Sequence, residues 1–337
     1  MSTKIRNFLI GLVVVLLILG VGGTLFYRNW IKTNIPLSFP QVDGEIQIKG
    51  LDAPVEVYRD EMGIPHIYAS TLHDLFMAQG YVQAQDRFWQ MDFWRHVGSG
   101  TVSEMFGKGE IETDAFLRTL GWRQTAETEY ASAEGNAKLM LDAYADGVNA
   151  YLDGRSGTEL SLEYGVLALL NADYAPEPWT PIHSLTWGKA MAWDLRGNMG
   201  AEIERAILLK TLSLEQVEEL FPSYPEDHPI IVPTIGENVA LTVDAPLTAL
   251  ESTAATSVLE NVNTNFALLD GVLGPTGAGI GSNSWAVAGS RTTTGMPILA
   301  NDPHLGIQMP SIWHQIDLRC HPISEGCSYE STGFSFP

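Results

Sequence analysis

The sequence predicts an α+β fold, because strand-like and helix-like patterns occupy separate stretches of the chain. Apolar and polar residues alternate within 44–70, and strand-like segments return within 284–318. Between them, apolar positions recur every three or four residues within 72–96 and 136–152, which is the spacing of amphipathic helices. Strands and helices that occur in separate runs are typical of α+β proteins.

The same patterns give the individual elements. Strands are expected at 45–48, 55–58, 66–68, 284–288, 297–300 and 312–318, and helices at 72–96, at 136–152, from about Ser184 past Arg196, and after Ser213. The helix at 72–96 is expected to break near Gly80, because glycine is a poor helix former. Ser213 is of the residue type that caps a helix N-terminus.

The composition describes an acidic globular protein. Hydrophobic residues make up 45% of the 337 residues, which is enough to bury a substantial core. The 40 Asp and Glu residues outnumber the 19 Lys and Arg residues, so that the net charge is −21. Such a surface repels phosphate backbones, which argues against a nucleic-acid partner.

The N-terminus carries a segment long enough to cross a membrane. Residues 8–27 are apolar apart from Thr24, and Lys4 and Arg6 precede them. A 20-residue apolar run exceeds the usual core of a cleaved signal peptide and matches the thickness of a bilayer. We therefore expect an uncleaved anchor with an extracytoplasmic body, and a cleaved signal is the alternative. Residues 28–43 are expected to form a linker.

A glycine-rich run at 271–281 ends on Gly281 and Ser282, and a strand-like pattern follows at once. Glycine permits strained backbone conformations, and it leaves its carbonyl group open to attack. If the bond between the two residues were cut, Ser282 would carry a free α-amino group with a pKa of about 7.7–8.0. One residue would then supply both a nucleophile and a base.

Short motifs occur in two parts of the chain. Those near Ser282 are GSNSW at 281–285, GSRT at 289–292, PILA at 297–300 and NDPH at 301–304. Those in the first third are GLDAPVEVYRD at 50–60, GIPHI at 63–67, AQGY at 78–81 and AQDRFWQM at 84–91. These motifs resemble those of the penicillin acylase family, whose members are N-terminal-nucleophile hydrolases and include cephalosporin and acyl-homoserine-lactone acylases. They occur in the order of the family, from about residue 44 to the last residue.

The resemblance implies a fold, a chain organisation and a reaction. The family fold is a four-layer αββα sandwich. The implied segments are an anchor or signal with a linker at 1–43, an α-chain region at 44–246, a spacer at 247–281 and the start of a β-chain at 282–337. We expect self-cleavage between Gly281 and Ser282 to give an α/β heterodimer that hydrolyses a linear amide. The substrate would be a small N-acyl compound, such as an acyl-homoserine lactone or the side chain of a β-lactam.

The resemblance also assigns roles to individual residues. Ser282 would be the nucleophile and, after cleavage, its α-amino group the base. His304 would stabilise the oxyanion of the tetrahedral intermediate. Trp193 and Arg196 fall where the α-chain helix of the family borders the acyl pocket, although such a cluster also suits an ordinary core.

A structural calcium ion is a further implication of the resemblance. Glu202 matches the α-chain glutamate that binds calcium in the family, and Glu204 is a competing candidate. Calcium takes several oxygen ligands, typically six to eight, so one glutamate is not a site by itself. No organic cofactor is expected.

Cys320 and Cys327 flank a turn-like HPISEG sequence. In an oxidising compartment they can close a hairpin with a disulfide, and two free thiols are the alternative.

The Asp and Arg residues of the family motifs are expected to hold the architecture; they are Arg59, Asp60, Asp86 and Arg87.

The chain ends early in what resembles a long β-chain. We therefore expect a C-terminally truncated precursor that lacks the second oxyanion donor and the catalytic asparagine of the family, and that is inactive by itself. The rival hypothesis is a non-catalytic, membrane-anchored binding or scaffold remnant of such an enzyme.

Overall fold

The computed structural model describes residues 3–195, 199–222, 225, 228, 258–262, 264–266, 269, 281–305 and 307–337. The chain forms two compact units. The first comprises Met1–Ala190 together with Ile307–Pro337, and the second comprises Met191–Gly306. Most of the spacer predicted at 247–281 lies outside the described residues. Arg196 also lies outside them.

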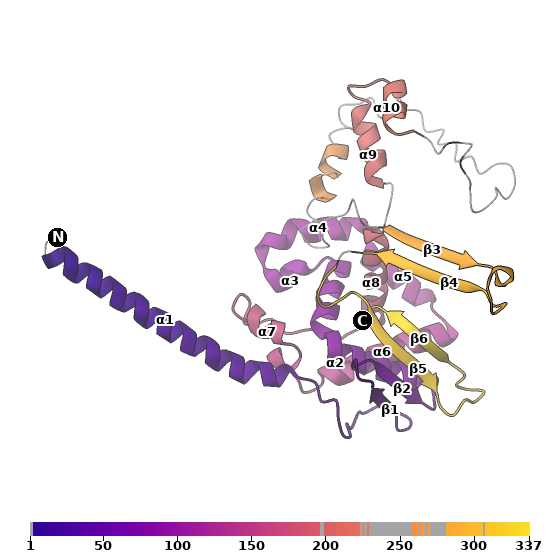
Figure 1. Cartoon of the computed structure of the whole chain (residues 1–337), viewed down its shortest axis with the longest axis horizontal. Coiled ribbons are helices and arrows are strands. Elements are labelled where there is room, and N and C mark those ends of the chain that lie inside the picture. The colour runs from indigo at the N-terminus through magenta and orange to yellow at the C-terminus, as the bar shows by residue number, and fades with distance from the viewer. Residues whose placement is uncertain are drawn as a thin grey trace. The chain divides into compact units, whose positions relative to one another are not determined.

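The first unit combines helices with one sheet (Figure 1). Its elements are α1 (Thr3–Ser38), β1 (Glu56–Arg59), β2 (Pro65–Ala69), α2 (Leu72–Ser99), α3 (Val102–Phe106), η1 (Lys108–Glu110), α4 (Ile111–Leu120), α5 (Trp122–Ser132), α6 (Gly135–Leu152), η2 (Gly157–Glu159), α7 (Leu162–Leu167), most of α8 (Pro181–Asp194), β5 (His314–Cys320) and β6 (Glu330–Ser335). Helices and strands occur in separate runs, so the predicted α+β class is confirmed.

The N-terminal helix α1 is longer than the apolar run within it. It continues through residues 28–38, which we expected to be a linker, and it includes Pro36 near its end. It is long and apolar enough to cross a membrane over Ile10–Ser38, and the most apolar stretch within it is not buried. The linker is therefore shorter than predicted, because the helix extends past Tyr27, where the uninterrupted apolar run ends.

The sheet has the strand order β1-β2-β5-β6. β2 and β5 are parallel, with Ile67 opposite Leu318, and the other two pairs are antiparallel. In β2, buried residues alternate with half-buried ones, and most residues of β5 are buried. The edge strands β1 and β6 are largely exposed. The strand predicted at 45–48 is wrong, because these residues have no ladder partner and are not a strand.

The long helix α2 packs along α6, and two glycines make this contact possible. A Cβ atom on Gly80 would lie 2.1 Å from the carbonyl oxygen of Tyr144, and one on Gly147 would lie 1.8 Å from that of Met77. Gly80 is thus a site of close helix approach, and the break predicted there is wrong. The non-helical residue within α2 is Arg87, with φ −143° and ψ 17°.

The ends of α2 follow ordinary capping rules. The side chain of Thr71 accepts a hydrogen bond from the backbone N–H of Asp74 at 3.0 Å, which satisfies a free donor of the first turn. Gly100 ends the helix in the left-handed conformation, with φ 65°.

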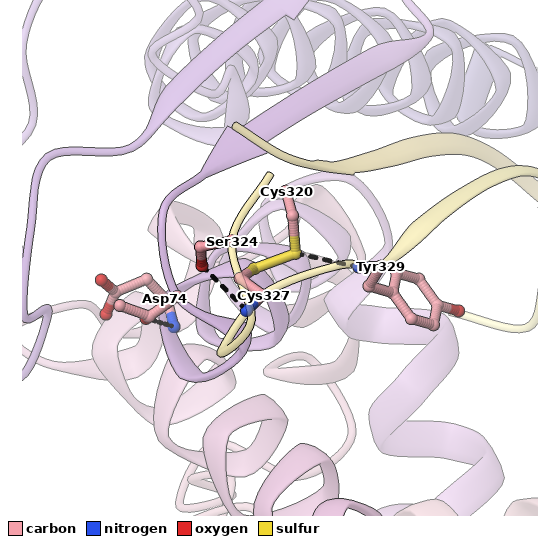
Figure 2. Close-up of a disulfide and its surroundings, with 6 residues drawn as sticks. Asp74, Cys320, Ser324, Cys327 and Tyr329 are labelled. Carbon is pink, nitrogen blue, oxygen red and sulfur yellow. Dashed lines mark hydrogen bonds between the residues drawn. A yellow bond between two sulfur atoms is a disulfide. The ribbon is translucent and has the colours of Figure 1, made fainter. Parts of the chain in front are cut away.

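A hydrophobic core lies where β2 and β5 meet α2, and the disulfide belongs to it. Ile67, Leu75 and Leu318 are buried in this core, as are both cysteines. Cys320 and Cys327 are disulfide-bonded, with Cα atoms 5.5 Å apart, and the N–H of Tyr329 donates to the Cys320 sulfur (Figure 2). The turn that follows β5 is thereby fixed against the core.

The second unit contains α9 (Met199–Leu208), α10 (Leu214–Leu220), η4 (Gly289–Arg291) and the two-stranded sheet of β3 (Gly281–Val287) and β4 (Ile298–His304). Ser213 caps α10 as predicted, in a reciprocal capping box with Gln216. The hairpin connection turns at Gly295, whose φ of 73° favours glycine.

Candidate active site

The hairpin of β3 and β4 brings together the two residues predicted to carry the chemistry. The antiparallel register places Gly281 opposite His304 and Ser282 opposite Pro303. Asn283 then stands opposite Asp302. Gly281 and His304, 23 positions apart in sequence, thus become cross-strand neighbours, and Ser282 lies one residue along β3 from this pair.

The hydroxyl group of Ser282 lies against the bond that we expect to be cut. Its Oγ donates a hydrogen bond to the carbonyl oxygen of Gly281 at 2.7 Å. A nucleophile that attacks the Gly281 carbonyl carbon must approach this same group. Gly281 is the first residue of β3 and is exposed, so the strained glycine backbone we expected there is replaced by a strand.

His304 makes two side-chain contacts at the same end of the hairpin. Its Nε2 lies 2.8 Å from Oδ2 of Asp302 and 3.4 Å from Nδ2 of Asn283. The Asp302 carboxylate can accept a hydrogen bond from the ring N–H and so fix the orientation of the ring. Sequence reasoning missed Asp302 and Asn283 as partners of His304, although both lie inside the motifs that flank the two predicted residues.

The predicted pocket and calcium residues lie elsewhere in the second unit. Trp193, near the end of α8, packs edge-on against Phe266 with ring centroids 5.3 Å apart. Glu202 is exposed in the first turn of α9, and Glu204 follows on the same helix. Within the described residues, neither glutamate belongs to a group of three potential metal ligands. Calcium binding at Glu202 stays a prediction.

Asp52, His73 and Asp74 form the one group of potential metal ligands found in the described part of the chain. The Asp74 carboxylate is fully buried and accepts hydrogen bonds from the backbone N–H groups of Asp52 and Ala53, at 2.9 and 3.1 Å. Its Oδ1 also lies 3.1 Å from Nδ1 of His73. These bonds account for a structural role, in which Asp74 holds the segment before β1 against α2.

Charged residues of the family-like motifs form a second polar network in the first unit. Arg59 on β1 makes a bidentate ion pair with Asp86 on α2, and Nε2 of His314 on β5 lies 3.1 Å from the same carboxylate. Burial raises the pKa of Asp86, but the bonds from His314 and Arg59 outweigh it and hold the pKa below its ordinary value. The architectural role expected for Arg59 and Asp86 agrees with this geometry, whereas His314 was not foreseen.

A sequence model of the penicillin amidase family matches residues 54–337. The chain belongs to the penicillin amidase family. It is 37% identical over 284 residues to penicillin acylase 2 proenzyme from Pseudomonas sp. strain SE83. The aligned region covers 84% of this chain and 34% of the relative. The chain is also 32% identical over 302 residues to acyl-homoserine lactone acylase QuiP from Pseudomonas aeruginosa. That alignment covers 90% of this chain and 33% of the relative.

The chain spans about one third of the length of these curated relatives. Among solved structures, it is similar to a thermostable penicillin G acylase from Alcaligenes faecalis, with 29% identity and a TM-score of 0.45. That match covers 54% of this chain and 98% of the other.

Proposed function

We propose that this chain is part of an exported acylase precursor that cuts itself between Gly281 and Ser282 and then hydrolyses a linear amide with Ser282. The observation that supports this most strongly is the 2.7 Å hydrogen bond from the Ser282 hydroxyl to the Gly281 carbonyl. Membership of the penicillin amidase family supports the reaction class.

Self-cleavage needs only groups at the junction and water. The Ser282 Oγ attacks the carbonyl carbon of Gly281, its proton passes to the departing nitrogen, and the peptide C–N bond breaks. The product is an ester between Gly281 and the Ser282 side chain, with a free α-amino group on Ser282. Water then hydrolyses the ester, which leaves a carboxylate on Gly281 and restores the hydroxyl group.

Amide hydrolysis would use the same hydroxyl group after cleavage. The α-amino group of Ser282 takes the hydroxyl proton, Oγ attacks the substrate carbonyl, and the amine leaves with that proton. Water then releases the carboxylic acid from the acyl-enzyme. The names of the relatives, penicillin acylase and acyl-homoserine lactone acylase, support a small N-acyl substrate of one of these kinds.

His304 would stabilise the negative charge that develops on the substrate carbonyl oxygen. Its position at the end of β4, opposite Gly281, supports this role, because a donor placed there lies next to the reacting groups. The contact with Asp302 would hold the ring in one orientation. Trp193 and Arg196 would line the acyl pocket, and calcium binding at Glu202 would be structural.

Export through α1 completes the proposal. The helix is apolar and unburied over the length of a membrane span, which supports an N-terminal anchor. A cleaved signal is the alternative. A disulfide between Cys320 and Cys327 is in keeping with an oxidising compartment outside the cytoplasm.

Trapping the acyl-enzyme tests the catalytic part of the proposal. The protein expressed from its complete gene is mixed with an N-acyl substrate, quenched and digested, and the acylated peptide is located by mass spectrometry. We expect the acyl group on Ser282, no adduct and no turnover for Ser282→Ala, and a loss of about 10²–10³ in rate for His304→Ala. Ser290→Ala, in the same hairpin, is the control and should keep turnover.

An acyl group on any residue other than Ser282, or turnover that survives Ser282→Ala, would contradict the assignment.

A further inference from the structure

The helix α1 touches the folded body close to the point where its apolar run ends. The run ends at Tyr27, and a Cβ atom on Gly165 of α7 would lie 3.0 Å from the indole ring of Trp30. Helical residues rise about 1.5 Å each, so Trp30 lies about 4–5 Å beyond Tyr27 along the axis. The C-terminal part of α1 therefore packs against α7, and Figure 1 shows the two helices side by side there.

The end of α7 exposes a group of apolar side chains. Val166, Leu169 and Leu170 are 52%, 72% and 81% exposed, and we call them the α7 apolar surface. The segment is firmly held, since the side chain of Asn171 donates to the backbone carbonyls of Glu104 and Met105 at 2.8 and 3.2 Å. Phe106, at the adjoining end of α3, is 41% exposed.

The depth at which α1 meets the body follows from the length of its apolar run. Twenty residues, 8–27, span about 30 Å, which is the thickness of the hydrocarbon core of a bilayer. The headgroup region adds about 5–7 Å on each side. A body that contacts Trp30 about 4–5 Å past the core then lies at the headgroups, where Tyr and Trp side chains such as Tyr27 and Trp30 are favoured.

We infer that the α7 apolar surface inserts into the headgroup region of the bilayer that α1 crosses, so that the body is held against the membrane at two places. This inference rests on the anchoring proposed above. The occupant is lipid rather than a protein partner, because α1 fixes the surface at the membrane. Burial of exposed leucines removes apolar area from water, which stabilises this docked orientation.

Site-directed spin labelling of the 337-residue chain tests the inference. Its two cysteines are joined in a disulfide, so one introduced cysteine can be labelled alone. The chain is reconstituted into phosphatidylcholine nanodiscs with a nitroxide at Leu170→Cys. Labels at Leu17→Cys, within α1, and at Leu139→Cys, an exposed leucine on α6, are the controls. Collisions with oxygen, which enters lipid, are compared with collisions with a water-soluble nickel chelate.

We expect the ratio of oxygen to nickel accessibility at Leu170 to exceed that at Leu139 several-fold, and to approach that at Leu17. A lipid-like ratio at Leu17 with a water-like ratio at Leu170 would overturn the inference and leave the anchor intact. Low accessibility to both oxygen and nickel at Leu170 would also overturn it, because it indicates burial against protein rather than lipid. A water-like ratio at Leu17 would instead contradict the proposed anchoring, and the inference with it. The same label at Leu169→Cys replaces the test position if Leu170→Cys fails to fold.

Discussion

Asp86 on α2 and His314 on β5 are 228 positions apart in sequence, yet His314 Nε2 lies 3.1 Å from Asp86 Oδ2. The junction of Gly281 and Ser282 lies between them along the chain. The parallel pairing of β2 with β5 joins the same two stretches. A cut at the junction would therefore leave both pieces bound together in the first unit, by a sheet, a core and an ion-pair network.

Asp86→Ala should destabilise the first unit by about 3–5 kcal/mol, because it leaves Arg59 largely buried without its partner. The lowered pKa of Asp86 also predicts the direction of a pH dependence. The contribution of Asp86 to the free energy of unfolding is fully present above the unfolded pKa of about 3.9, and it is lost as the pH falls through the lower pKa of the folded state. Urea denaturation checks both points. Glu127→Ala, which removes a half-exposed ion pair with Arg123, should cost at most about 1 kcal/mol. Equal losses for the two variants would contradict this account.

Gly147→Ala should destabilise the contact between α2 and α6. The new methyl group would meet the Met77 carbonyl oxygen at 1.8 Å, which neither backbone can relieve without separating the helices. Overpacking of this kind costs about 1–3 kcal/mol or more. Gly188→Ala on α8 is the matched control, because its methyl group meets nothing within 4 Å and should be neutral or stabilising. The free energies of unfolding of the two variants decide the point.

Stability should fall as the pH drops below about 6.5, and His183 should account for part of the loss. Burial, and then the charge of Arg95, lowers the pKa of His183 to about 3. Its neutral ring accepts a hydrogen bond from the Thr180 N–H at Nδ1, which protonation would break. The unfolded chain takes up a proton below about 6.5 and the folded chain does not, so about 2 kcal/mol should be lost by pH 5.

Denaturant titrations between pH 7 and pH 5 measure this dependence. His183→Gln should flatten the curve by the amount assigned to His183, even if it lowers stability overall. An unchanged slope in the variant would show that His183 does not carry the effect.

Loss of the disulfide should have a moderate cost. The chain-entropy relation gives about 2–3 kcal/mol for a loop of this size. The variant Cys320→Ala/Cys327→Ala should lose this amount in the free energy of unfolding, and mass spectrometry of the exported protein should find no free thiol. Two free thiols in the exported protein would contradict the pairing.

The local parts of this fold could be predicted from the sequence, and the non-local parts could not. Periodicity gave α2 and α6 nearly to their ends, because each helix shows its own apolar face. The break predicted at Gly80 was wrong, because the sequence of α2 alone does not show that α6 approaches closely there. Nothing in the pattern of 312–318 indicates that β5 pairs in parallel with β2, or that His314 meets Asp86.

For the candidate site, the predictions came from motifs that resemble a known family, and the roles of the residues stay predictions. Ser282 and His304 were named from that resemblance, and the register of β3 and β4 places them at one end of a hairpin. The contacts of His304 with Asp302 and Asn283 were not foreseen, because side-chain direction depends on the register of the strands.

The most direct test of the account is the N-terminal sequence of the second chain produced from the complete gene. The account predicts two chains, the second beginning at Ser282, and a single uncut precursor for Ser282→Ala. Ser282→Cys should still be cut, because a thiol can attack the Gly281 carbonyl. A second chain that begins at any other residue, or cleavage that persists in Ser282→Ala, would contradict the central claim.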